Sequence, residues 1–182
     1  MLTAILLTVL GTLARLAPHP PNAVAMGALA LYAGARLPRR WAFLVPMAAM
    51  AASDVWIDWG SGRSVLAIDR ITGYATFALI VASGRWLRST TSPMARMGMS
   101  VAASTAFFLT SNFVVWASPQ VGHPTFPATM DGLLQCYAFA LPFFRKTLVA
   151  DLIGTAVLFG LDGLAYRVTS RWKPASAALA VE

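Results

Sequence analysis

Charged residues and cysteine are both scarce in this chain of 182 residues. Only 12% of the residues are charged, whereas a soluble domain carries about 25%. The single cysteine, Cys136, excludes a disulfide within the chain, and the absence of a CxxC motif or a Cys/His cluster argues against structural zinc. Hydrophobic residues make up 58% of the sequence instead. This composition argues against a soluble domain.

The motifs of common enzymes are missing as well. The sequence has no HExxH, no GxSxG, no GxxxxGKS/T and no GxGxxG after a strand. No motif therefore supports a metalloprotease, hydrolase or nucleotide-binding function. We therefore expect a protein that is not an enzyme, holds no cofactor and depends on a partner for any use of ATP. A membrane-embedded enzyme would have only a pair of carboxylates to work with.

Basic residues outnumber acidic ones, with 14 Lys and Arg against 7 Asp and Glu and a net charge of +7. In a soluble chain this excess would suggest nucleic-acid binding. Here the charges lie in small groups between apolar runs, which is typical of loops at a membrane surface. The pattern predicts a lipid bilayer, and no nucleic acid, as partner.

Six apolar runs approach the roughly 20 helical residues that cross a bilayer core about 30 Å thick. The apolar segment 128–141 is too short for a seventh span and favours a re-entrant or interfacial helix. The predicted fold is a single all-α transmembrane domain, a bundle of six transmembrane helices with this short helix before the last span and a cytoplasmic tail at 169–182. The predicted spans are 2–17, 22–37, 41–57, 65–87, 94–118 and 142–168.

The first run also has the apolar character of a secretion signal. No basic residue precedes Leu2, and Ala17 is followed by Pro18-His19-Pro20-Pro21, whereas a signal peptide has a basic start and a small-residue cleavage site. We expect the run to be retained as a span.

Orientation follows from the basic residues, because loops rich in Lys and Arg tend to stay cytoplasmic. With both termini inside, nine basic residues fall on the cytoplasmic side and five outside. Most acidic residues fall outside, which predicts that the binding chemistry lies on the outer face. The inner basic residues are Arg36, Arg39, Arg40, Arg85, Arg88, Arg96, Arg167, Arg171 and Lys173, and the outer acidic ones are Asp54, Asp58, Asp69, Asp131 and Asp151.

Small residues recur four apart in several spans, as in Ala30 with Gly34 and Ala48 with Ala52. In lipid, such pairs let helix backbones approach closely. They fit packing inside the bundle, and they also fit a face that docks a partner.

Two candidate binding segments lie early in the chain. The first, Pro18-His19-Pro20-Pro21-Asn22, offers an imidazole and an amide on a rigid backbone, or is a helix break with Asn22 as N-cap. The second pairs Asp54 with Asp58, which share a helical face at a spacing of four. These carboxylates would bind a cation or a cationic substrate, or would pair across the bundle with an arginine. The candidate arginines are Arg63, Arg70 and Arg145.

A third group of polar and aromatic residues ends the fifth span and continues into the last one. An amide, aromatic rings and cations suit a planar or anionic organic ligand, although an aromatic belt with headgroup-binding cations has the same composition. Asp151 is either the partner of an arginine or part of the site, and Cys136 is either a metal ligand or a small buried hydrophobe. The predicted binding residues of this group are Asn112, Trp116, Gln135, Cys136, Tyr137, Arg145 and Asp151.

The chain resembles an uncharacterised family of bacterial membrane proteins in the stretches PHPPNAVAMGALALYAG (18–34), AASD (51–54), SNFVVW (111–116) and GLLQCYAFALPFFRKTLVAD (132–151). That family is similar to the substrate-binding S components of energy-coupling factor transporters. The resemblance implies a six-helix bundle in the bacterial inner membrane, a vitamin or metal site facing outward, and no ATPase of its own. It also implies a coupling membrane protein with ABC-type ATPases as partner. The recurring positions are His19, Pro20, Asn22, Asp54, Asn112, Trp116, Cys136, Tyr137, Arg145 and Asp151.

These observations lead to one expected function and one alternative. We expect a membrane-embedded subunit that binds a small organic micronutrient, of the vitamin or metal-tetrapyrrole class, at the outer face for uptake. The alternative is a structural accessory subunit of a larger membrane complex, in which the small-residue faces and aromatic belts are docking surfaces.

Overall fold

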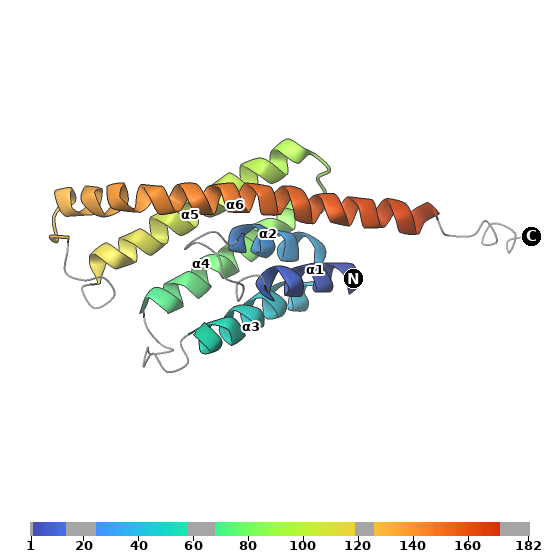
Figure 1. Cartoon of the computed structure of the whole chain (residues 1–182), viewed down its shortest axis with the longest axis horizontal. Coiled ribbons are helices and arrows are strands. Elements are labelled where there is room, and N and C mark those ends of the chain that lie inside the picture. Colours follow the sequence, from blue (N-terminus) through green and yellow to red (C-terminus); the bar gives the residue numbers. More distant parts are fainter. Residues whose placement is uncertain (1, 14–24, 58–67, 119–125, 172–182) are drawn as a thin grey trace, which may run out of the picture.

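The computed structural model describes residues 2–13, 25–57, 68–118 and 126–171. These residues form six α-helices and one short 3-10 helix, without a strand among them. The prediction of an all-α fold is confirmed. The elements are α1 (Leu2–Leu13), α2 (Met26–Arg36), α3 (Arg39–Ile57), α4 (Ile68–Gly84), η2 (Arg85–Arg88), α5 (Pro93–Ala117) and α6 (Met130–Arg171) (Figure 1).

Helix α5 begins at a favourable local sequence. The Ser92 side chain accepts a hydrogen bond from the backbone N–H of Ala95 at 3.4 Å, and Pro93 stands in the first turn. Serine at the N-cap followed by proline is a preferred start, because proline lacks an N–H that would otherwise be unsatisfied. The helix continues for 25 residues, about 38 Å at 1.5 Å per residue. The residues of its two halves are therefore held on one long, continuous helix.

Helix α2 lies at the centre of the bundle (Figure 1). It contacts every other helix of the described chain, and all residues from Gly27 to Ala35 are buried. Small residues permit this close packing: a Cβ added to Gly34 would lie 2.0 Å from the carbonyl oxygen of Val81 in α4. The pair of Ala30 and Gly34 thus belongs to packing within the bundle.

Both ends of α2 are held by side chains that are distant in the sequence. At its N-terminus no local side chain caps the helix, and the backbone N–H of Ala28 instead donates to Asp151 Oδ1 at 3.0 Å. At its C-terminus Arg88 donates from Nε to the carbonyl oxygen of Gly34 at 3.1 Å and from Nη2 to that of Leu37. The terminal backbone groups of a buried helix need such partners, so α2 can end inside the protein.

The last helix differs from the prediction. The segment 128–141 was expected to form a separate re-entrant or interfacial helix, but α6 runs without interruption from Met130 to Arg171, with Pro142 inside it. Proline removes one helical hydrogen bond. Cys136 and Tyr137 meanwhile bond to carbonyl groups of α5 before the proline, so packing against α5 on this side keeps the helix continuous.

Two of the described helices are long and apolar enough to cross a membrane, Pro93–Ala117 and Met130–Val168. Helices α1 and α2 have only 12 and 11 described residues. The other helices coincide in part with predicted spans, and whether all six cross a membrane stays a prediction.

Candidate functional site

Helices α5 and α6 carry matching rows of small, polar and aromatic side chains. On α5 the row contains Ser104, Phe107, Phe108, Ser111 and Asn112, and on α6 it contains Ala140, Phe143, Phe144 and Thr147. Spacings of three and four place each row on one helical face. Since α5 and α6 pack along each other, the two rows meet.

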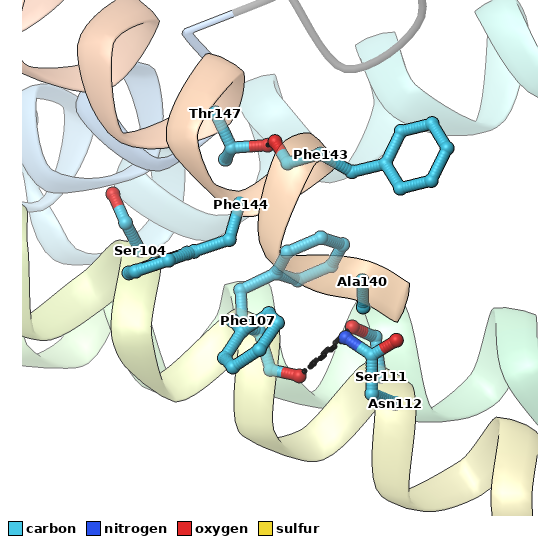
Figure 2. Close-up of a pocket in the computed structure, with 9 residues that line it drawn as sticks. Ser104, Phe107, Ser111, Asn112, Ala140, Phe143, Phe144 and Thr147 are labelled. Atoms are coloured by element: carbon cyan, nitrogen blue, oxygen red, sulfur yellow. Dashed lines mark hydrogen bonds between the residues drawn. The ribbon is translucent and has the colours of Figure 1, made fainter. Parts of the chain in front are cut away.

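A cavity of about 230 Å³ lies between these two rows. Figure 2 shows α5 and α6 providing its opposite walls. Its aromatic wall is continuous, because the ring centroid of Phe108 lies 4.6 Å from that of Phe144 and 5.5 Å from that of Tyr137. Rings at such distances form favourable pairs, so they offer an ordered surface on which a flat molecule can stack.

The polar groups of the cavity are one amide and three hydroxyls. Asn112 Nδ2 donates to the carbonyl oxygen of Phe108 at 2.8 Å (Figure 2), which fixes the amide and leaves Oδ1 without a hydrogen-bond partner among the described residues. Ser111 Oγ and Thr147 Oγ1 donate to carbonyls of their own helices, and a donating hydroxyl can still accept. The lining contains no charged side chain, so the chemistry favours a neutral ligand.

The neighbouring predicted residues Cys136, Tyr137 and Trp116 join chain segments to one another. Cys136 is 3% exposed and its Sγ lies 3.5 Å from the Asn112 carbonyl oxygen, while the Tyr137 hydroxyl donates to the Leu109 carbonyl oxygen at 2.8 Å. Trp116 Nε1 donates to the Pro127 carbonyl oxygen at 3.0 Å. The part of the chain that the structure describes contains no group of three metal-ligating side chains. The burial of Cys136 and its contact with the Asn112 carbonyl oxygen favour a small buried side chain.

Asp151 lies behind the cavity wall, next to Ser104, and is 1% exposed. Ser104, which lines the cavity, places its Oγ 2.7 Å from Asp151 Oδ2, and the opposite oxygen accepts from Ala28 at the start of α2. Farther along, Thr155 Oγ1 donates to Ser100 Oγ at 3.1 Å. The hydrogen-bond partners of Asp151 are thus the Ser104 hydroxyl and backbone N–H groups at the start of α2, not an arginine.

The remaining predicted site residues lie elsewhere. Asp54 on α3 accepts a hydrogen bond from Tyr74 Oη of α4 at 2.8 Å, which places it in a different pair of helices. Gln135 and Arg145 are exposed on α6 and do not line the cavity. His19 and Asn22, like Asp58 and Arg63, fall outside the described residues. The described structure therefore brings Asn112, Cys136 and Tyr137 together but not Asp54, Gln135 or Arg145.

Sequence reasoning did not single out the inner part of the cavity, Ser104, Phe107, Phe108 and Ala140. A signal was present: small residues recur at 100, 104 and 111 in one span and at 136, 140 and 147 in the other. Spacings of four and seven place such residues on one face. Two such rows in helices of membrane length would have predicted the contact.

Among curated proteins and among solved structures, no match to the chain is found. A family match, in contrast, extends over residues 1–175 and so covers nearly the whole sequence. The chain belongs to DUF6580, a family of unknown function.

Proposed function

We propose that the protein is a membrane-embedded subunit that binds a small organic micronutrient for uptake. The observation that carries the proposal is the cavity of about 230 Å³ between α5 and α6, the two described helices that are long enough to cross a membrane. A concave, mostly apolar site with a few fixed polar groups is the usual form of a small-molecule site. In the predicted orientation, Asn112 and Ala140 lie in the outer half.

The exterior of the bundle supports a membrane location. Large apolar side chains are exposed on α1, α3, α4, α5 and α6, including Leu79 at 71% and Phe139 at 70%. Several polar side chains are buried instead, among them Ser100, Ser104, Asp151 and Thr155. Soluble monomers rarely expose large apolar patches. In the proposed arrangement the chain crosses the bacterial inner membrane six times, with both termini in the cytoplasm.

The cavity restricts the ligand by charge and by size. Its walls have no charged side chain, so a neutral, flat ring stacking on Phe108 and Phe144 and donating a hydrogen bond to Asn112 Oδ1 fits best. Pockets for drug-sized ligands have volumes of about 300–1,000 Å³, and this cavity of about 230 Å³ is smaller. A vitamin-like single or fused ring is therefore favoured over a metal tetrapyrrole.

Transport needs energy that this sequence has no motif to supply. Because the chain lacks a nucleotide-binding motif, the proposal assigns ATP hydrolysis to ABC-type ATPases that act through a coupling membrane protein. In that assembly, this protein would be the subunit that selects the substrate.

A cavity-filling variant tests the proposal. Ala140 is buried in the cavity wall, whereas Ala138 is exposed on the same helix, so Ala140→Leu and Ala138→Leu add the same volume in different places. Native mass spectrometry of protein extracted in mild detergent should detect a retained small molecule in the wild type and in Ala138→Leu. Ala140→Leu should lose it, because a side chain now occupies the space.

A second measurement separates ligand loss from misfolding. Thermal unfolding against a panel of vitamins should show a stabilised wild type, by about 3 kcal/mol at a ligand concentration of 100 times Kd, and an Ala140→Leu protein that still unfolds cooperatively but does not respond. No retained molecule and no shift across the panel would contradict the proposal. Stoichiometric recovery with other membrane subunits, unaffected by Ala140→Leu, would support the accessory-subunit alternative.

A further inference from the structure

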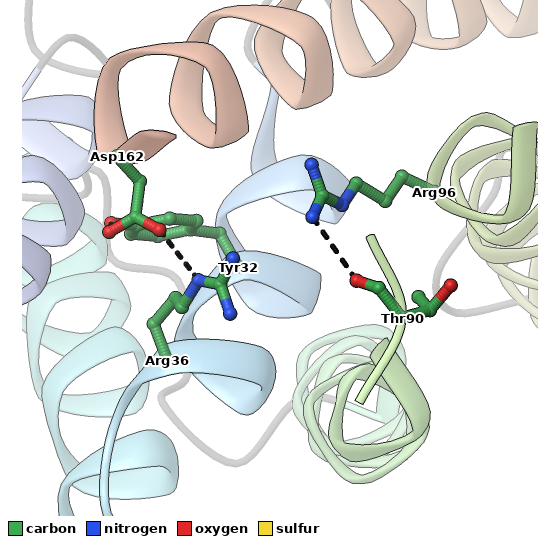
Figure 3. A network of polar contacts seen from close by, with 5 residues as sticks. All are labelled: Tyr32, Arg36, Thr90, Arg96 and Asp162. Atoms are coloured by element: carbon green, nitrogen blue, oxygen red, sulfur yellow. Dashed lines mark hydrogen bonds and ion pairs between the residues drawn. The ribbon is translucent and has the colours of Figure 1, made fainter. Parts of the chain in front are cut away.

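Three arginines converge at the opposite end of the bundle from the outer cavity. Arg36 ends α2, Arg88 ends η2, and Arg96 lies in the first turns of α5. The C-terminal third of α6 completes this end with Asp162 and Phe159. Figure 3 shows Arg96 reaching from α5 toward α2, where Arg36 and Tyr32 meet Asp162.

Of these three guanidinium groups, Arg36 alone pairs with a carboxylate in the described part of the chain. Arg36 Nε lies 2.7 Å from Asp162 Oδ2, and the Tyr32 hydroxyl donates to Asp162 Oδ1 at 3.1 Å. Arg88 donates to backbone carbonyl oxygens at the end of α2. Each oxygen of Asp162 thus already accepts a hydrogen bond, and no second carboxylate pairs with this group in the described part of the chain. The cluster keeps an excess of positive charge.

Arg96 is held in place and is incompletely satisfied. Its guanidinium carbon lies 4.8 Å from the Phe159 ring centroid, and Nη2 donates to the Thr90 carbonyl oxygen at 3.1 Å (Figure 3). Its Nε is buried and has no hydrogen-bond partner among the described residues. An unsatisfied donor on a buried charged group costs more than a neutral one. The guanidinium of Arg96 therefore keeps unused hydrogen-bonding capacity beside Phe159.

Arg36 faces the same aromatic ring. Its guanidinium carbon lies 5.5 Å from the Phe159 centroid, so one ring orients two cations that repel each other. The positive end of the 25-residue helix α5 adds to the field. The two cations and the helix end favour an anion, and planar guanidinium forks suit the oxygens of a phosphate group in particular.

We infer that Arg36 and Arg96 form a binding site for a phosphate group at this end of the bundle. The phosphate oxygens accept from the terminal nitrogens of both arginines, which the Phe159 ring orients. The phosphate belongs either to a phospholipid headgroup or to a free anion. The site is separate from the cavity between Asn112 and Ala140.

The wild-type protein in nonionic detergent gives the first test. Native mass spectrometry should detect retained phosphatidylglycerol but not the diacylglycerol with the same acyl chains, which lacks the phosphate. In a parallel arm, inorganic phosphate is compared with chloride at equal ionic strength by thermal unfolding. A response to phosphatidylglycerol alone identifies a lipid headgroup, and a response to inorganic phosphate identifies a free anion. The absence of both responses would overturn the inference.

Variants then locate the site. Arg96→Gln should weaken the response about tenfold or more, because hydrogen bonds to charged groups contribute about 1.5–3 kcal/mol. Arg40→Gln removes the same charge from an exposed position at the start of α3 and should change binding by less than about threefold. An equal loss in both variants would indicate unspecific charge and overturn the inference.

A third variant, Arg96→Lys, keeps the inference testable if Arg96→Gln does not fold. Arg96→Lys keeps the charge and the stem of the side chain but removes the planar fork, which is what the proposed site uses. It should unfold at a temperature close to that of the wild type and bind phosphate several-fold more weakly, because an ammonium group lacks the paired terminal nitrogens of the fork. Binding equal to that of the wild type would contradict the assigned role of Arg96.

Discussion

Asp151 joins three helices through a single buried carboxylate. It accepts from Ala28 at the start of α2 and lies 2.7 Å from Ser104 Oγ of α5. The Ser104 hydroxyl has one proton and lies also 3.0 Å from the Ser100 carbonyl oxygen, so it can donate to only one of these acceptors at a time. A side chain at 151 that both accepts from α2 and donates to Ser104 would satisfy the Ala28 N–H and Ser104 Oγ.

Because Ser104 has only one hydroxyl proton, two substitutions at Asp151 should have different effects on stability. Asp151→Ala leaves the Ala28 N–H and Ser104 without partners and should lower the free energy of unfolding by about 2–4 kcal/mol. Asp151→Asn should change it by less than about 1 kcal/mol, because its amide accepts and donates. Unfolding in a denaturing-detergent titration measures both.

The matched control for Asp151 is Asp131, which is exposed in the first turn of α6. Asp131→Ala loses only a favourable interaction with the helix dipole, about 0.3–1 kcal/mol. A loss for Asp151→Ala no greater than this would show that the carboxylate does not hold α2 in place.

At single positions, the sequence predicts which side chains matter better than it predicts their partners. Asp151, Asn112 and Cys136 stand out because polar side chains are rare in apolar spans. The partners of Asp151 lie 123 and 47 residues away, and nothing in local periodicity encodes such contacts. Arg145 stands out equally, yet it is exposed, because a long cationic side chain at a helix surface reaches solvent or headgroups without a protein partner.

At the scale of elements, helices α2 and α4 are in close backbone contact at two glycines, Gly34 and Gly84. A Cβ on Gly34 would lie 2.0 Å from the Val81 carbonyl oxygen, and one on Gly84 would lie 2.4 Å from that of Leu31. Real Cβ atoms do not approach backbone this closely, so the helices would have to separate. The contact depends on the absence of a side chain at both positions.

Alanine substitutions test this close contact. Gly34→Ala and Gly84→Ala should each destabilise the protein by about 1–3 kcal/mol through overpacking. Gly73→Ala, in the same helix α4 but with no atom within 4 Å of the new Cβ, should be neutral or stabilising by up to about 1 kcal/mol. The same unfolding titration distinguishes them, and equal effects at Gly73 and Gly84 would exclude a tight contact.

Helix existence follows from the sequence more reliably than helix continuity. Apolar runs and proline breaks place all six helices, because both signals are local. The continuous α6 was not predicted, since Pro142 and the short run before it resemble a break. The packing of this part of α6 on α5, which includes Cys136 and Tyr137, depends on residues distant in the sequence. The burial of α2 on every side also depends on neighbours, although its small residues are consistent with it.

At the scale of the whole molecule, charge divides the described chain into two ends. Arg36, Arg88 and Arg96 gather at one end with Asp162, whereas the uncharged cavity lies farther along α5 and α6. If α5 crosses the membrane, Ser89 before it and Ala128 before α6 lie on opposite sides, because a helix of 25 residues covers about 38 Å, more than the roughly 30 Å core.

Cysteine labelling tests this topology directly. Ser89 and Ala128 are exposed, while the native Cys136 is 3% exposed and should stay unlabelled in the wild type. In intact cells, a membrane-impermeant maleimide should label Ala128→Cys but label Ser89→Cys only after permeabilisation, since the positive end is expected to face the cytoplasm. Labelling of both from the same side would mean that α5 does not cross. The reverse pattern would place the arginine cluster outside and the cavity toward the cytoplasm, where it could not collect a nutrient for uptake.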